Sequence, residues 1–123
     1  GDYQQAVEHG VGLSSNTRGI FAGGQGDNPY PFYNDIGYIT IASTGNSSNF
    51  GSLVTNGNGM GGANNSPRGV FVGGEGAGNV LQYITIASTG NSTDFGDSVN
   101  PGNNNYMWGN SGGGNWQLNK LPL

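Results

Sequence analysis

The sequence has no cysteine and very little positive charge. Because none of its 123 residues is Cys, disulfides and thiolate metal sites are excluded. The basic residues are only Arg18, Arg68 and Lys120, too few to neutralise several phosphates, so we expect no nucleic-acid binding. No apolar run reaches half of the roughly 20 residues that a membrane helix needs. We therefore expect no membrane insertion either.

Charged residues are scarce in general, whereas glycine is abundant. Only 8% of the chain is charged, and 26 residues are Gly and 5 are Pro, a composition that excludes a helix bundle or a coiled coil. The net charge of −4 is small, so charge repulsion gives the chain no reason to stay unfolded. The length allows one domain, and a domain of this size has a limited core.

The sequence contains an internal repeat. Residues 38–47 recur without change as residues 83–92, at an offset of 45. Upstream, residues 18–24 match residues 68–74 at an offset of 50, so the first copy carries five extra residues within the segment 26–33. The ends of the chain fit the same frame. We therefore divide a single β-repeat domain, 1–123, into units 1–50, 51–95 and 96–123, the last one truncated.

Each unit is expected to hold short strands. Residues 38–43 and 83–88 alternate Ile with Tyr and Thr, a period of two that indicates a strand, and a turn follows each. Further strands are predicted at 19–22 and 69–72, at 10–14 and 59–64, and at 49–53 and 94–99. No helical periodicity occurs. The pattern predicts an all-β fold of tandem four-stranded repeats.

Both copies carry a double glycine, then a tyrosine, then a further aromatic residue. These are Gly23, Gly24, Tyr38 and Phe50 in the first copy and Gly73, Gly74, Tyr83 and Phe95 in the second. The order resembles the kelch blade of β-propellers, although the basic residue that kelch units carry after the aromatic is absent. The resemblance implies propeller-like blades. Propellers close with four or more blades, and this chain holds fewer than three units, so a three-fold β-prism or β-trefoil is the alternative.

The repeated strand, together with the Arg-Gly-Val-Phe-Val-Gly-Gly segment at 68–74, carries a narrower likeness. It is similar to tandem repeats in tail-fibre and other virion structural proteins of phages that infect marine cyanobacteria. The resemblance implies a non-enzymatic virion structural protein, in a tail fibre or surface appendage, that presents loops for host attachment. Its expected partners are other copies of itself, other virion proteins, and a host-surface glycan or receptor. The alternative is an extracellular carbohydrate-binding lectin.

Two groups of aromatic residues are the candidate binding residues. Tyr30, Phe32 and Tyr33 lie in the inserted segment among prolines, and Tyr106 and Trp108 lie in the truncated third unit. Such rings offer contact area at low entropy cost, which suits sugar stacking or a protein contact. The competing interpretation is structural: the inserted loop covers the end of a sheet, and the second group caps the array.

Neither catalysis nor metal binding is predicted. His9 is the only histidine, and no Gly-x-Ser-x-Gly nucleophile motif is present, so we expect no enzyme and no cofactor. Asp94 and Asp97 could offer oxygens to Ca²⁺. The first copy has Asn49 and Ser52 at these places, so such a site would not repeat, and we interpret both Asp residues as turn formers.

Overall fold

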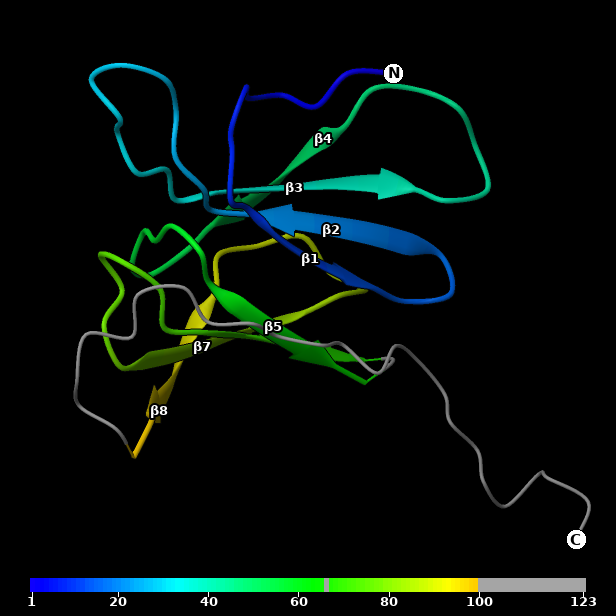
Figure 1. Cartoon of the computed structure of the whole chain (residues 1–123). Coiled ribbons are helices and arrows are strands. Elements are labelled where there is room, and N and C mark those ends of the chain that lie inside the picture. Colours follow the sequence, from blue (N-terminus) through cyan, green and yellow to red (C-terminus); the bar gives the residue numbers. More distant parts are fainter. Residues whose placement is uncertain (66, 100–123) are drawn as a thin grey trace, which may run out of the picture.

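The computed structural model describes residues 1–65 and 67–99, and these form two four-stranded antiparallel sheets and no helix. The all-β prediction is confirmed. The first sheet holds β1 (Val11–Ser14), β2 (Arg18–Ala22), β3 (Asp35–Thr40) and β4 (Ser48–Ser52); the second holds β5 (Gly61–Asn64), β6 (Arg68–Val72), β7 (Val80–Thr85) and β8 (Thr93–Asp97). In each sheet the strands follow chain order, and the sheets lie one above the other (Figure 1). In this part of the chain there is consequently no helix able to cross a bilayer.

The two sheets have the same pairing pattern at the repeated sequence positions. Gly12 pairs with Phe21 as Gly62 pairs with Phe71. The register between β3 and β4 shifts at one point, and the register between β7 and β8 shifts at the equivalent point. The residues that are repeated in sequence therefore occupy equivalent places in two antiparallel meanders.

The predicted strands 38–43 and 83–88 were wrong at both ends. β3 and β7 begin three residues earlier and end at Thr40 and Thr85. A turn follows in each case: the amide of Ser43 donates to the Thr40 carbonyl over 3.2 Å, and Ser88 repeats this bond. Gly37 pairs with a neighbour on both sides, and Asp35 pairs with Ser52 of β4 while its carbonyl accepts from the Gly23 amide over 3.1 Å. This pairing holds both residues in β3 despite their poor strand propensity. The other predicted strands differ from the observed ones by one or two residues at one or both ends.

One face of the first sheet packs on one face of the second, through contacts of β1 with β5 and β6. Val11 and Leu13 point from β1 toward glycines. A Cβ atom added at Gly62 would lie 2.8 Å from methyl carbons of both side chains, and one added at Gly69 would lie 2.5 Å from Leu13. The core comprises Val11, Leu13, Ile20, Ala22, Ile36, Phe50, Leu53, Met60, Phe71, Ala77, Ile84 and Ile86. The missing side chains at Gly62 and Gly69 allow the two sheets to approach closely.

Residues at equivalent positions differ in exposure because each sheet is covered on one face only. Phe71 is 0% exposed under the first sheet, whereas its equivalent Phe21 is 40% exposed. Ile86 is 1% exposed and its equivalent Ile41 is 52% exposed. On the other faces the order reverses, since Phe50 is buried and Phe95 is exposed. The pair of sheets thus leaves large apolar side chains exposed at each end.

The described residues form two sheets and not a closed ring. The division between the first two units, at residues 50 and 51, falls within β4. The sheets themselves span 11–52 and 61–97. Most of the third unit, with Tyr106 and Trp108, lies outside the described residues.

Replacing Gly62 by Ala is expected to destabilise the protein by about 1–3 kcal/mol, because the new methyl group overpacks against Val11 and Leu13. The matched control is Gly12→Ala at the equivalent position, where the nearest atom to the new Cβ is the Ile20 carbonyl oxygen at 3.8 Å. This control should be neutral or slightly stabilising. Urea unfolding at low protein concentration measures both. Equal losses for the two variants would contradict the packing of β1 on Gly62.

Candidate functional site

The inserted segment forms a projecting loop between β2 and β3 (Figure 1, cyan). The loop is closed like a small hairpin. The amide of Gly26 donates to the Pro31 carbonyl over 3.0 Å, and the amide of Tyr30 donates to the Asp27 carbonyl over 3.2 Å. Gln25 forms bridges to Glu8 on one side and to Phe32 on the other. These bonds give the loop a defined shape.

The structure does not bring the three aromatic side chains of this loop together on one surface. Phe32 packs against the second sheet's loop: a Cβ atom at Gly76 would lie 2.9 Å from its ring, and the side-chain Nδ2 of Asn56 donates to its backbone carbonyl over 3.2 Å. Tyr33 packs back onto Gly26 within the loop. Tyr30 is different, because it lies at the tip with a φ of 63° and is 59% exposed. Two of the rings therefore fix the loop, and one is available for contact.

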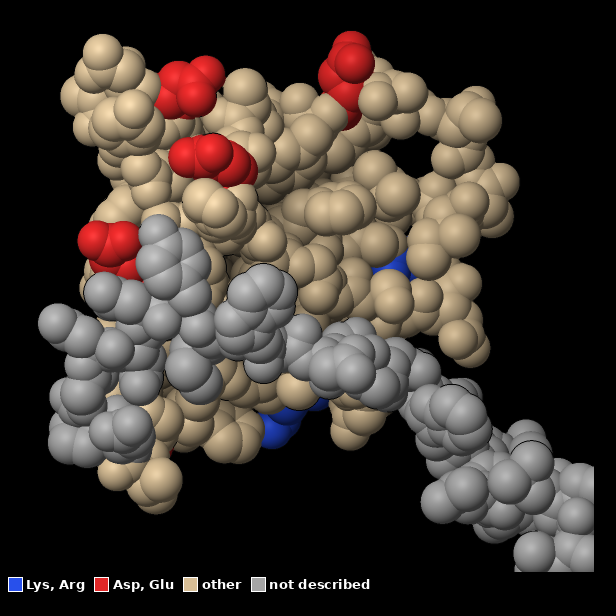
Figure 2. Space-filling view, viewed as in Figure 1, with Lys and Arg blue, Asp and Glu red and all other residues tan. Residues whose placement is uncertain are grey.

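The surface around the loop is sparsely charged. The face seen in Figure 2 is mostly uncharged, with a few separate acidic side chains and little basic surface. Asp27 lies in the loop, and Glu8 pairs with the base of the loop at Gln25. A ligand of the loop would therefore meet an aromatic tip beside isolated carboxylates, not a strong field of either sign.

The double glycines end β2 and β6, and their backbone conformations require glycine. Gly23 and Gly24 have φ values of 62° and 100°, and Gly73 and Gly74 have 56° and 96°. A Cβ atom at Gly23 would lie 2.7 Å from the carbonyl oxygen of Gly57, and the Gly24 amide donates to that same oxygen over 2.9 Å. In the first sheet, the double glycine thus also ties the sheet to the connection that leads to the second.

Tyr38 and Phe50 belong to a stack that includes a basic residue. The Arg18 guanidinium lies 4.6 Å from the centre of the Tyr38 ring, and the Phe50 ring meets Tyr38 edge-on at 5.9 Å. Arg18 Nη1 also donates to the carbonyl oxygen of Ile86 over 2.9 Å, across the interface between the sheets. Arg18 is therefore a polar link from the first sheet to the second.

The second sheet holds the same stack. The Arg68 guanidinium lies 4.4 Å from the centre of the Tyr83 ring, and the Phe95 ring meets Tyr83 edge-on at 5.9 Å. Sequence reasoning assigned no role to either arginine. The signal was present, however, because Arg18 and Arg68 are repeated at the offset of 50.

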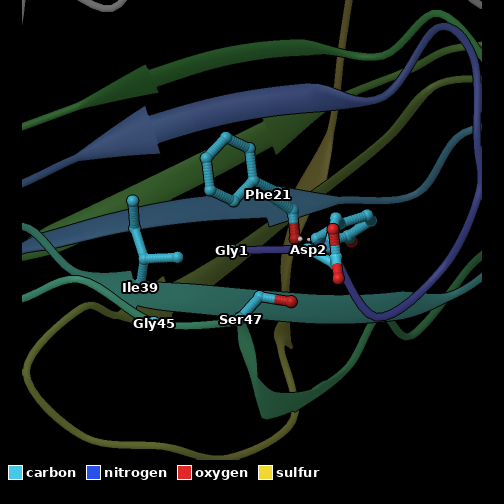
Figure 3. A pocket seen from close by; sticks show the side chains of 7 residues that line it. Gly1, Asp2, Phe21, Ile39, Gly45 and Ser47 are labelled. Carbon is cyan, nitrogen blue, oxygen red and sulfur yellow. Dashed lines mark hydrogen bonds between the residues drawn. The ribbon is translucent and has the colours of Figure 1, made fainter.

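A hollow of about 340 Å³ lies on the exposed face of the first sheet (Figure 3). Phe21 from β2 and Ile39 from β3 line it, and residues 1–3 and the hairpin at Gly45 and Ser47 complete it. The Tyr3 ring meets Phe21 edge-on at 5.7 Å. Burial, and to a lesser degree the nearby Asp35 carboxylate, raise the pKa of Tyr3 above its usual value of 10.0.

The residues considered for catalysis or metal binding take part in hydrogen bonds of loops and turns. The backbone carbonyl of His9 accepts a bond from the Gly59 amide over 3.0 Å. Asp94 Oδ1 accepts from the Gly96 amide over 2.8 Å, as in an Asx turn. Within residues 1–65 and 67–99, no three His, Cys, Asp or Glu side chains gather as a metal site would require.

Comparisons with known proteins give no family. No family model matches the chain, and no curated protein shows significant sequence similarity to it.

Arg18→Met is expected to lower the free energy of unfolding by about 2 kcal/mol, because it removes a charged hydrogen bond across the sheets as well as the ring contact. Arg68→Met is the control. Within the described residues, the Arg68 side chain has the ring contact but no hydrogen bond to the other sheet, so its loss should lower the free energy of unfolding clearly less. Chemical unfolding at low protein concentration compares them. Losses of the same size would show that the Arg18–Ile86 bond contributes nothing.

The raised pKa of Tyr3 predicts a pH dependence of stability. The folded state holds the phenol proton more tightly than the unfolded state, so this contribution is complete below pH 10 and is lost as the pH rises through the folded-state pKa. Tyr3→Phe should reduce the decrease in the free energy of unfolding that occurs above pH 10. Urea unfolding on both sides of pH 10 measures this. An unchanged slope in the variant would contradict this prediction.

Proposed function

We propose that this protein is a non-enzymatic structural component of a phage virion, in a tail fibre or surface appendage, whose β-sheets act as propeller-like blades and present a loop for host attachment. The observation that carries the proposal is the loop between β2 and β3. Phe32 packs on Gly76 of the second sheet's loop, Tyr33 packs on Gly26 within the loop itself, and the third aromatic residue, Tyr30, is exposed at the tip. Loops that rigid sheets hold in one shape are suited to recognition.

The organisation of the sheets supports a scaffold role. The second sheet has a short connection, residues 73–79, where the first has residues 23–34. One repeat framework therefore carries loops of different length at one position without a change in its strand pairing. This is the pattern of a structural array on which one loop has been elaborated.

The virion role is tested by mass spectrometry of purified phage particles from the host in which the gene is expressed. Peptides of this chain should co-purify with infectious particles through a density gradient. Their absence from particles would overturn the virion role.

Attachment is tested with the purified chain and host cells. Tyr30→Ala should reduce binding of fluorescently labelled protein at least about tenfold, since Tyr30 is the exposed ring of the loop and a tyrosine that acts as an interface hot spot contributes about 2 kcal/mol or more. The matched control is Val54→Ala, because Val54 is similarly exposed, at 56%, but lies outside the loop. Equal binding by the two variants would overturn the role of the loop. A glycan array would show whether the receptor is a carbohydrate.

A further inference from the structure

The contact between the two sheets shows what kind of surface covers each face. We call Gly62, Gly69, Phe71, Ile84 and Ile86 the receiving face of the second sheet, because they lie under the first sheet. We call Val11, Leu13, Arg18 and Ile20 the inserting face of the first sheet, because they pack onto it. This internal contact is a template for any further contact between such sheets.

The receiving face of the first sheet has the same residue types, but it is open. Its members, at equivalent repeat positions, are Gly12, Gly19, Phe21, Ile39 and Ile41. Gly12 has nothing but a backbone oxygen near its open side, and Phe21 and Ile41 are well exposed. The hollow in Figure 3 lies on this face, next to Phe21 and Ile39. In the second sheet, the equivalent apolar, glycine-containing surface is covered by another sheet of the same repeat.

The amino-terminal segment makes the same hydrogen bonds to the first sheet that the connector between the sheets makes to the second sheet. The Asp2 amide donates to Asn46 Oδ1 over 2.9 Å, as the Ser52 amide donates to Asn91 Oδ1 over 3.0 Å. The Gln4 amide donates to Ser47 Oγ over 2.8 Å, and a bond of the same length joins Val54 and Ser92. The first sheet therefore repeats the Asn and Ser bonds of a receiving face, although Gly37 stands where the second sheet has Gln82.

The second sheet carries the matching polar group of an inserting face. The Arg68 guanidinium is held over Tyr83 at 4.4 Å, as Arg18 is held over Tyr38 at 4.6 Å. Arg18 donates to the carbonyl of Ile86. In an equivalent contact, Arg68 of one copy would donate to the carbonyl of Ile41 in the next copy.

The apolar groups of the second sheet's inserting face are smaller than those of the first. Gly61 and Ala63 of the second sheet stand where the first sheet has Val11 and Leu13. On the open receiving face, Tyr3 stands where the connector has the smaller Leu53, and its ring lies against Phe21. The open receiving face thus presents a larger side chain at this position than the covered one does.

We propose that the open receiving face of β1–β4 binds the β5–β6 side of a second copy of this chain, so that copies stack head to tail. The two surfaces are different patches of one chain, so the contact is heterologous and each added copy presents a new receiving face. This inference depends on the packing of the sheets and not on the location in a virion, so it stands or fails separately from the proposed function.

Sedimentation velocity of the purified chain over a range of concentrations tests the proposal. The unmodified chain should form a series of species that grows beyond a dimer with concentration. Ile41→Asp blocks the receiving face and Arg68→Met weakens the inserting face, and each alone should weaken association at least about tenfold. Val54→Asp, at a similarly exposed position outside both faces, should associate like the unmodified chain.

Mixing the two variants makes the test decisive. Ile41→Asp keeps an intact inserting face and Arg68→Met keeps an intact receiving face, so the mixture should form dimers and no larger species. Circular dichroism and unfolding midpoints verify that each variant is folded, as expected for changes at exposed side chains. A monomeric unmodified chain, association that neither variant weakens, or a mixture that stays monomeric would each overturn the proposal.

Discussion

The side chains of Val11 and Leu13 pack against backbone at Gly62 and Gly69, and the arrangement of the two sheets depends on this contact. A β-carbon at either glycine would meet these side chains at less than 3.0 Å, so the sheets can approach this closely only where side chains are missing. A chain with few large apolar residues still obtains a buried centre in this way. Its abundant glycine is then a condition for packing as well as for turns.

Polar groups fix the orientation of one sheet on the other. Arg18 reaches the Ile86 carbonyl, and the Asn64 side chain donates to the Ser14 carbonyl. Gln82 is fully buried and binds the connector through its amide oxygen at the Val54 amide, 2.8 Å away, and through its amide nitrogen at the Thr55 carbonyl, 2.9 Å away. Because buried polar groups are costly when they are unpaired, these bonds favour this packing over slipped alternatives. Each sheet therefore contacts the other sheet through one face, and its opposite face takes no part in this contact.

The repeat made the number, order and approximate places of the strands predictable from sequence, since each strand recurs with its turn. Strand ends were harder, because Asp35 and Gly37 pair with neighbouring strands against their local propensity. Ile41 lies in a turn although it continues an alternating pattern. Packing was beyond local reasoning altogether. Nothing in the pattern distinguishes Phe21 from Phe71, yet the second is buried by the other sheet and the first is not. Similarly, the sequence left open whether the three loop aromatics make contacts or cover the sheet. The structure shows that Phe32 packs on Gly76 and Tyr33 on Gly26, whereas Tyr30 is exposed.

Close packing of one sheet onto the glycines of the next thus connects the stability of the chain, the rigid display of its loop and its two open faces. The most direct measurement is of nuclear Overhauser contacts in the labelled chain at low concentration. The account predicts strong contacts from the Leu13 methyl groups to the Hα protons of Gly62 and Gly69. Loss of these contacts while the β1–β2 pairing persists would contradict it.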